Sequence, residues 1–253
     1  MSTRLTTLLI LAATPLAAQN PTPPGARWPM HAMDRPRPPV VAPAPARAAP
    51  PPADAIVLFG GGALDAWTHE DGTPARWIVR DDVVEVRPGS GGIRTRRAFG
   101  DVQLHIEWSA PTPPRGEGQD RGNSGVFLMQ YYEVQILDSY RNDTYADGQA
   151  GALYGQAPPL ANPVRPPGQW NAYDIVFRRP RFAADGALLE PARATVIVNG
   201  VVVQNSAAFT GRTAHMRLPQ YEVHESRRPL SLQDHGAPVR FRNIWIRELP
   251  EEP

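Results

Sequence analysis

Two carboxylic side chains with an amide between them stand close together in the segment Tyr132 to Asp138. The segment is typical of a β-strand, where alternate side chains share a face, so Glu133 and Gln135 lie on one face about 7 Å apart. Asp138 joins that face only if the strand has a bulge near residues 136–137, and bulges concentrate beside active sites. The pattern E-x-Q-x-x-D then presents two carboxyl groups, which glycoside cleavage uses as acid and as base or nucleophile. The alternative is that both acids are ordinary solvated side chains.

Further candidate side chains lie at turns and strand ends. Asn123, at the entrance of the preceding strand, suits hydrogen bonding to sugar hydroxyls, although an ordinary turn uses the same residue type. Trp170 follows a Pro-Gly turn and Tyr154 stands near two glycines, so either ring can stack on a sugar or fill the core. His235, in a turn before the last strand, is interpreted as a proton carrier or hydroxyl-binding group, because an imidazole has an ordinary pKa of about 6.5. Its alternative is a turn histidine bonded to the backbone.

No metal or cofactor is predicted. The chain has no cysteine and no helical H-x-x-x-H pair, which are the usual signs of zinc. Oxygen-ligated calcium stays open as an alternative at Asn142-Asp143-Thr144. Glu107 is a further acid on the polar face of the strand Gln103 to Trp108, and Arg242 lies on the last strand.

The elements that would position these side chains are β-strands. Residues 103–108 and 239–247 alternate in hydropathy, with inward and outward assignments that change along the second segment. An Asn199-Gly200 turn joins residues 194–198 to 201–204 as a hairpin. No apolar repeat at three-to-four-residue spacing is sustained, which excludes a helical bundle and argues against a parallel βαβ sheet. We therefore predict an all-β fold built as an antiparallel β-sandwich or barrel.

The two ends are predicted to lie outside the folded domain. Residues 1–18 combine Arg4, a short apolar run and small residues, the pattern of a secretory signal peptide. We therefore expect a bacterial protein that is periplasmic or secreted, without a membrane span after cleavage, because the apolar run is too short to cross a bilayer. Residues 19–54 are rich in proline and alanine and are expected to be a linker without core contacts. Residues 55–249 would then form one domain and residues 250–253 a tail.

The charge of the chain limits its partners. The formal net charge of +1 gives no electrostatic reason to bind nucleic acid or an anionic membrane. Without cysteine, no disulfide supports the exported fold, so stability must come from its core. The sequence leaves the oligomeric state open.

Several short motifs follow one another in a fixed order along the chain. They are Leu58-Phe59-Gly60-Gly61 with Asp65-Ala66-Trp67, Gly122 to Leu128, Tyr132 to Ser139, Gly151-Ala152-Leu153-Tyr154-Gly155, Trp170-Asn171, Val198-Asn199-Gly200, and Leu232 to Gly236 with Val239 to Arg247. This ordered set resembles the 3-keto-disaccharide hydrolase domain family over essentially all of residues 55–249. One segment departs from the family, since Met129-Gln130-Tyr131 stands where a glycine-containing turn is expected.

The resemblance implies a concanavalin A-like lectin/glucanase jelly roll that binds carbohydrate across one sheet. It also implies substrates that are disaccharides or glycosides oxidised to a ketone at C3 of one sugar. The spacing E-x-Q-x-x-D is similar to the E-x-D-x-x-E strand of retaining glucanases with this fold, in which the first acid is the nucleophile and the last the acid/base. Gln135 and Asp138 depart from that pattern, so the glucanase mechanism does not transfer directly.

A ketone at C3 acidifies the hydrogen on C2, which opens a route by elimination and rehydration. We assign Glu133 as the base, with Asp138 or His235 protonating the leaving oxygen. Two readings from other classes stay open: a non-catalytic, lectin-like carbohydrate-binding domain, and a surface-adhesion module in which the carboxylates are structural. The side chains expected to bind the substrate are Gln135, Asn123, Glu107, Arg242, Trp170 and Tyr154.

Overall fold

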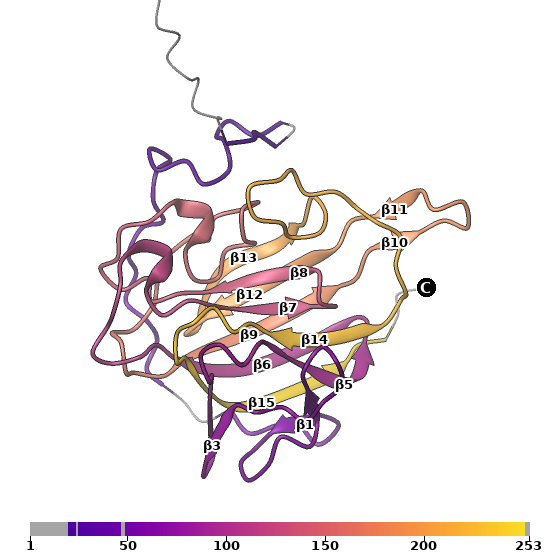
Figure 1. The fold of residues 1–253 in the computed structure, drawn as a ribbon. Helices are drawn as coiled ribbons and strands as arrows, with labels where there is room; N and C mark the ends of the chain where they lie inside the picture. Colours follow the sequence, from indigo (N-terminus) through magenta and orange to yellow (C-terminus); the bar gives the residue numbers. More distant parts are fainter. Residues whose placement is uncertain (1–19, 24, 47–48, 251–253) are drawn as a thin grey trace, which may run out of the picture.

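Two antiparallel β-sheets stack face to face as a β-sandwich jelly roll, which confirms the predicted fold class (Figure 1). The structure, a computed structural model, describes residues 20–23, 25–46 and 49–250. The predicted signal peptide lies outside the described residues, as does all but the first residue of the predicted tail. Within the described ranges, no helix is long and apolar enough to cross a membrane.

The strands divide unequally between the sheets. The larger sheet has the order β13 (Val201–Ala208), β12 (Arg193–Val198), β9 (Asn171–Arg178), β6 (Val102–Ser109), β15 (Arg240–Glu248), β4 (Val83–Glu85) and β3 (Ile78–Arg80), with β1 (Ile56–Phe59) also paired to β15. The smaller sheet has the order β2 (Trp67–Thr68), β5 (Ile93–Phe99), β14 (Arg228–Leu232), β7 (Ser124–Leu128) and β8 (Tyr132–Ile136). The remaining elements are β10 (Arg181–Phe182), β11 (Leu188–Glu190), η1 (Gly118–Asp120) and η2 (Ala146–Gly148).

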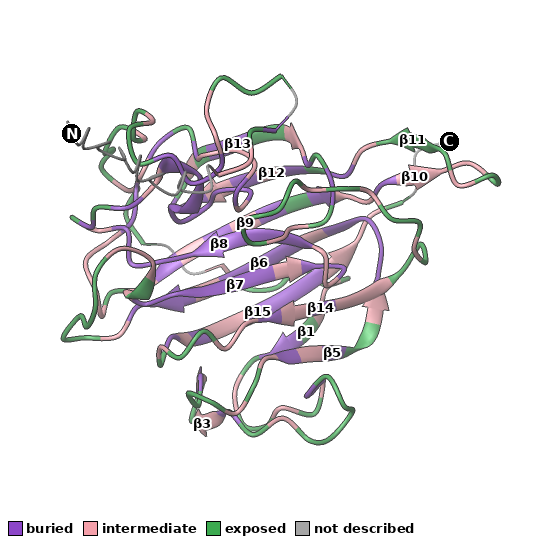
Figure 2. Ribbon diagram, turned by 45° about the horizontal axis from the view of Figure 1, so that its top comes forward, coloured by how far each residue is buried: buried purple, intermediate pink, exposed green. Residues whose placement is uncertain are grey.

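The core lies between the two sheets and takes alternate side chains from each. Strand β6 contributes Leu104, Ile106 and Trp108, and β8 contributes Tyr132 and Val134, all of them buried. Figure 2 shows β6, β7 and β8 as largely buried strands in the middle of the sandwich. Because side chains alternate along a strand, the intervening residues of β6 and β8 point away from the core. Acids at those positions on the two strands therefore lie on opposite outer faces of the molecule.

The hairpin turns follow the backbone preferences of their residues. Asn199 and Gly200 adopt φ angles of 51° and 81°, as the predicted two-residue turn between β12 and β13 requires. Between β7 and β8, Met129 and Gln130 adopt φ angles of 53° and 61°. This left-handed backbone makes the turn without the glycine that the family pattern led us to expect.

An irregularity in β15 explains why its hydropathy pattern changes along the strand. The register with β6 shifts between Arg242 and Trp245, and Asn243 between them has a φ of 46°. A β-bulge of this kind adds a residue to one strand and re-aims the side chains that follow. As a result, Phe241 is buried before the bulge and Ile244 directly after it.

The proline- and alanine-rich segment lies against the domain, so the expectation of a linker without core contacts is wrong. Figure 1 shows the indigo segment passing along one side of the sandwich. Met30 is 1% exposed, and the backbone N–H of His31 donates to Asp147 Oδ2 at 3.0 Å. Val40 forms a parallel β-bridge with Asn162. These contacts are isolated single residues. For this reason the segment can lie on the domain although its sequence has no repeating apolar pattern.

Removing this segment is expected to destabilise the protein. A chain that begins at Pro52 should melt at least about 3 °C below a chain that begins at Asn20. Burying one methionine side chain contributes about 1.5–3 kcal/mol, and 1 kcal/mol corresponds to about 2–4 °C in a protein of this size. Thermal unfolding followed by circular dichroism measures the difference. Equal melting temperatures would restore the interpretation of residues 20–51 as a linker.

Candidate active site

A pocket of about 180 Å³ opens on the outer face of the smaller sheet. Its walls come from β7, β8, the segment that continues β14, and the loops that follow η2 and β13. The lining residues are Asn123, Phe127, Glu133, Gln135, Tyr154, Thr213, Ala214, His215, Gln233 and His235. The pocket thus brings together five of the nine predicted site residues, among them the predicted base Glu133 and one predicted acid, His235.

The β7–β8 ladder places the two central residues of the E-x-Q pattern in this pocket. Gly125 pairs with Gln135 and Phe127 pairs with Glu133, so all four side-chain positions are on the outer face. A Cβ atom at Gly125 would collide with Glu133 Oε1. Glycine at this position therefore leaves the space that the carboxyl group occupies.

Glu133 is a buried acid without a counter-charge. Its residue is 4% exposed, and among the described residues no basic side chain forms an ion pair with it. Burial raises the pKa of Glu133 to about 8, because desolvation penalises the charged form. The amide of Gln135, turned so that its nitrogen faces acceptors, donates to Glu133 Oε1 at 3.2 Å. An acid with a pKa near the working pH can both take and return a proton.

Hydroxyl and imidazole groups surround this acid. The hydroxyl of Tyr154 lies 2.8 Å from Tyr145 Oη and 3.1 Å from His215 Nδ1, and burial raises the pKa of Tyr154. The backbone N–H of Glu133 donates to Thr213 Oγ1 at 3.1 Å. This bond ties the loop after β13 to the edge of β8, so the loop closes one side of the pocket.

The segment after β14 brings His235 to the opposite side of the pocket. The backbone N–H of Gln233 donates to Gly125 O at 3.1 Å, which continues the ladder between β14 and β7. Asp234 Oδ1 then accepts from the backbone N–H of Gly236 at 2.9 Å and closes a turn. His235 is exposed at the top of this turn, beside the pocket that contains Glu133.

Asp138 does not share the pocket with Glu133. The β7–β8 ladder ends at Ile136 without a bulge, so the geometry that would return Asp138 to the Glu133 face is absent. Instead, Asp138 Oδ2 accepts from Arg121 Nε at 2.7 Å, and its Oδ1 accepts from the backbone N–H of Tyr140 at 3.2 Å. These bonds hold the loop that follows β8.

Three other predicted residues lie on the far side of the sandwich. Glu107, Trp170 and Arg242 line a separate cavity on the outer face of the larger sheet, with both sheets between them and Glu133. Burial alone would raise the pKa of Glu107, but hydrogen bonds from His105, from Asn243 and from Arg242 outweigh it and lower the pKa to about 2. A carboxylate held this firmly in its charged form is poorly matched to proton transfer near neutral pH.

Two pocket residues carried no signal in the sequence. Thr213 and His215 lie in the irregular segment between β13 and β14, where no hydropathy pattern or motif marks them. His31 carried no signal either, and its ring stacks on Tyr145 with centroids 4.3 Å apart and lies 5.2 Å from the Tyr154 ring.

The loop considered for calcium uses its oxygen atoms for contacts within the protein. Asn142 Oδ1 accepts from the backbone N–H of Gly118 at 2.9 Å, and Thr144 Oγ1 accepts from Gln119 at 2.8 Å. Asp143 forms an ion pair with Arg37. Across the ranges that the structure describes, no group of three histidine or acidic side chains is arranged to hold a metal ion.

Comparisons with known proteins identify relatives of the chain in sequence and in structure. Residues 54–247 match the family model of the 3-keto-alpha-glucoside-1,2-lyase-like domain. A 3-keto-disaccharide hydrolase of Bacteroides thetaiotaomicron is 21% identical over 252 residues, covering 77% of this chain and 78% of that protein. The crystal structure of a candidate glycosyl hydrolase from Parabacteroides distasonis is 47% identical with a TM-score of 0.78, covering 90% of this chain and 100% of the other. A second candidate glycosyl hydrolase from that organism, 20% identical with a TM-score of 0.56 over 78% of this chain and 94% of the other, shares the fold.

Proposed function

The chain belongs to the 3-keto-alpha-glucoside-1,2-lyase-like domain family, and we propose that it cleaves the glycosidic bond of sugars that carry a ketone at C3. The family and the glycosyl hydrolase-like neighbour place it among carbohydrate-processing proteins. The observation that carries the finer proposal is Glu133, a buried acid that has no counter-charge among the described residues and a pKa of about 8, in a pocket lined by hydroxyl and imidazole groups. A glutamic acid whose pKa is shifted toward the working pH is characteristic of acid–base catalysis.

The proposed reaction is an elimination followed by hydration. The Glu133 carboxylate removes the proton on C2, which the neighbouring C3 ketone has made acidic. The electron pair of the C2–H bond forms a C1=C2 double bond while the C1–O bond breaks, and the leaving oxygen takes a proton from His235. Water then adds its hydroxyl to C1 of the enone and gives its remaining proton to His235, and Glu133 returns a proton to C2. The sum is hydrolysis, with a free 3-keto sugar and an alcohol as products.

The remaining pocket residues receive binding roles in this proposal. Gln135 and Asn123 offer amides to sugar hydroxyls, and Tyr154 offers its hydroxyl and ring. We assign protonation of the leaving oxygen to His235 rather than Asp138, because Asp138 is bound to Arg121 and does not line the pocket.

An adjoining hollow gives room for the leaving group. It measures about 450 Å³ and shares Phe127 and Gln233 with the Glu133 pocket. Tyr131 lies in this hollow with the guanidinium groups of Arg212 and Arg228 at 4.4 and 4.2 Å from its ring centroid. The two hollows adjoin at these shared residues, which supports a disaccharide or a glycoside as substrate.

A paired-substrate assay tests the proposed function. The mature chain should release sugar from a 3-keto-disaccharide at least about 10²-fold faster than from the unoxidised disaccharide, because only the ketone makes C2–H acidic. Product release is measured by liquid chromatography. Binding of both sugars without release from either would overturn the enzymatic proposal in favour of the lectin-like alternative.

We also propose that the protein acts outside the cytoplasm of a bacterium. This rests on the signal-peptide pattern of residues 1–18, which lie outside the described residues.

A further inference from the structure

A second cavity lies on the face opposite Glu133 and has no part in the proposed reaction. It measures about 930 Å³, within the usual size range of ligand sites. Its floor is formed by outward side chains of β6, β9 and β15. Above the floor lie residues 44–46 and 49–50 of the N-terminal segment, which precede the part of the chain that the family model matches.

The N-terminal segment is attached at both ends of this cavity. Asn243 Nδ2 and Trp245 Nε1 donate to Ala49 O at 3.0 and 3.2 Å. At the other end, a guanidinium nitrogen of Arg165 donates to Ala44 O. The space between segment and sheet is therefore bounded by fixed contacts.

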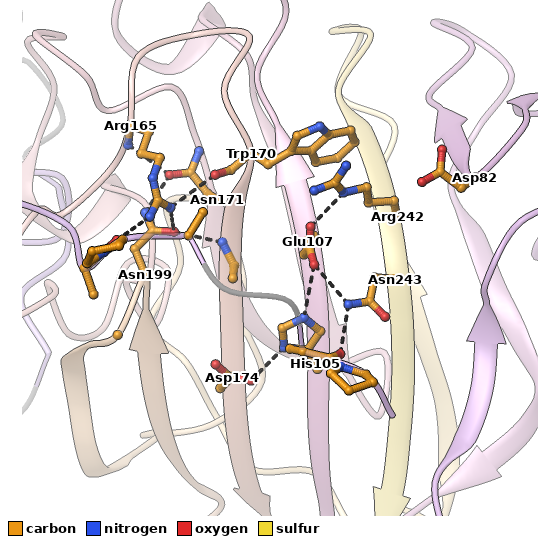
Figure 3. A pocket seen from close by; sticks show the side chains of 17 residues that line it. Asp82, His105, Glu107, Arg165, Trp170, Asn171, Asp174, Asn199, Arg242 and Asn243 are labelled. Carbon is orange, nitrogen blue, oxygen red and sulfur yellow. Dashed lines mark hydrogen bonds and ion pairs between the residues drawn. The ribbon is translucent and has the colours of Figure 1, made fainter. Parts of the chain in front are cut away.

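The floor carries a preformed network of charged groups (Figure 3). His105 Nδ1 lies 2.7 Å from Asp174 Oδ1, and the His105 ring stacks on Trp245 with centroids 5.2 Å apart. Glu107 Oε2 accepts from Arg242 Nε at 2.7 Å, and its Oε1 accepts from Asn243 at 2.9 Å. Burying such groups is costly, and a sheet face covered only by alanine and proline would not need them.

The charges around the cavity balance, which indicates a neutral ligand. Burial would lower the pKa of His105, but hydrogen bonds to Asp174 and Glu107 outweigh it and raise the pKa to about 9, so the ring is charged at neutral pH. The three cations and three carboxylates that line the cavity therefore cancel. They are Arg165, Arg242, His105, Glu107, Asp174 and Asp82. A site for phosphate or another anion would need an excess of positive charge.

Several polar atoms at the cavity have hydrogen-bonding capacity left over. Within the part of the chain that the structure describes, Asp174 Oδ2, the Asp82 carboxylate and the terminal nitrogens of Arg242 form no hydrogen bond to protein. The Asp174 side chain is 44% exposed. Beside them stands Trp170, with the Arg242 guanidinium 4.2 Å from its ring centroid. Carboxylates accept from hydroxyls, a guanidinium donates to them, and an indole offers an apolar wall for C–H groups.

From these observations we propose that the cavity is a second, non-catalytic carbohydrate-binding site, which holds a neutral sugar between Trp170, Asp174, Asp82 and Arg242. The site would keep the protein on glycan material while the Glu133 pocket works on the opposite face. It does not depend on the ketone chemistry, because an unoxidised sugar satisfies it.

Calorimetric titration of the mature chain with maltose, cellobiose and trehalose tests this site. At least one of these unoxidised disaccharides should bind, and Trp170→Ala should weaken its binding tenfold or more. Trp28→Ala is the matched control, because that half-buried tryptophan lines neither pocket and should leave the dissociation constant within twofold. Asp82→Ala, an exposed change that should not affect folding, tests the same site if Trp170→Ala fails to fold.

Three results would overturn the proposal. One is that none of the three disaccharides binds at a concentration 20-fold above the dissociation constant of a ~1 mM site. Another is binding that Trp170→Ala and Asp82→Ala leave unchanged, which would place the sugar elsewhere. The third is tighter binding of inorganic phosphate than of any sugar, which would make the cavity an anion site. Loss of turnover on 3-keto sugars with sugar binding intact would contradict only the proposed function.

Discussion

Replacing Glu133 by glutamine is expected to lower kcat/KM for a 3-keto-disaccharide by at least about 10²-fold, the loss typical of removing a general acid–base group. Glutamine has nearly the same shape and keeps a hydrogen-bonding oxygen, so the affinity for the substrate should change little. Initial rates of sugar release measure the effect. Glu190→Gln is the matched control, since that exposed acid on β11 lies outside the Glu133 pocket and should leave turnover unchanged.

The same substitution should not weaken the fold, which separates loss of chemistry from loss of structure. The pKa of Glu133 is about 8 in the folded protein and 4.5 in its ordinary state. Between these values the folded chain retains a proton that the unfolded chain has lost, so the acid lowers the free energy of unfolding as pH rises. Glutamine cannot ionise and avoids this cost. Glu133→Gln should therefore melt at or above the wild-type temperature at pH 8, with the difference shrinking toward pH 4.5.

Turnover of Glu133→Gln above a few per cent of wild type would place the base elsewhere. Glu107 is a poor substitute, because its carboxylate is ion-paired with Arg242 on the far face. Asp138 is a poor substitute as well, because its carboxylate is ion-paired with Arg121. A lower melting temperature at pH 8 would instead contradict the buried, uncompensated state of Glu133.

Local patterns in the sequence predicted local structure well. Alternation identified the strands that became β6, β8, β12, β13 and β15, and Asn199-Gly200 located their clearest turn. The E-x-Q spacing correctly placed Glu133 and Gln135 on one face. These predictions succeeded because they depend only on neighbours along the chain.

Predictions that depended on distant parts of the chain were less successful. The alternation of apolar and polar residues shows that the Glu107 side chain faces away from the core. It does not show to which of the two sheets the strand belongs, because that depends on the order of the strands. Glu107, Trp170 and Arg242 were therefore grouped with Glu133, although the sandwich separates them. Likewise, His215 reaches the pocket on an irregular loop that is held by hydrogen bonds to residues distant in sequence, such as those of Thr213 to Glu133 and to Tyr131.

The N-terminal segment shows a different limit. Proline and alanine without a period predict a spacer, yet the segment lies on the domain through isolated contacts such as the stacking of His31 on Tyr145. Single anchors of this kind leave no periodic pattern. The same segment lines the cavity on the larger sheet, so a division of the chain by composition alone left part of that cavity's wall out of the domain.

Removal of the C2 proton by Glu133 is the central claim, and the reaction in heavy water tests it most directly. The base exchanges with solvent and returns a proton to C2 during hydration, so the released 3-keto sugar should carry deuterium at C2. Mass spectrometry and proton NMR measure the label and its position. Free product incubated with the protein for the same time must show much less label, because the ketone alone permits slow enolisation. Deuterium at C2 in nearly every newly formed product molecule is the result we expect. Complete cleavage without label at C2 would contradict elimination and favour direct displacement at C1.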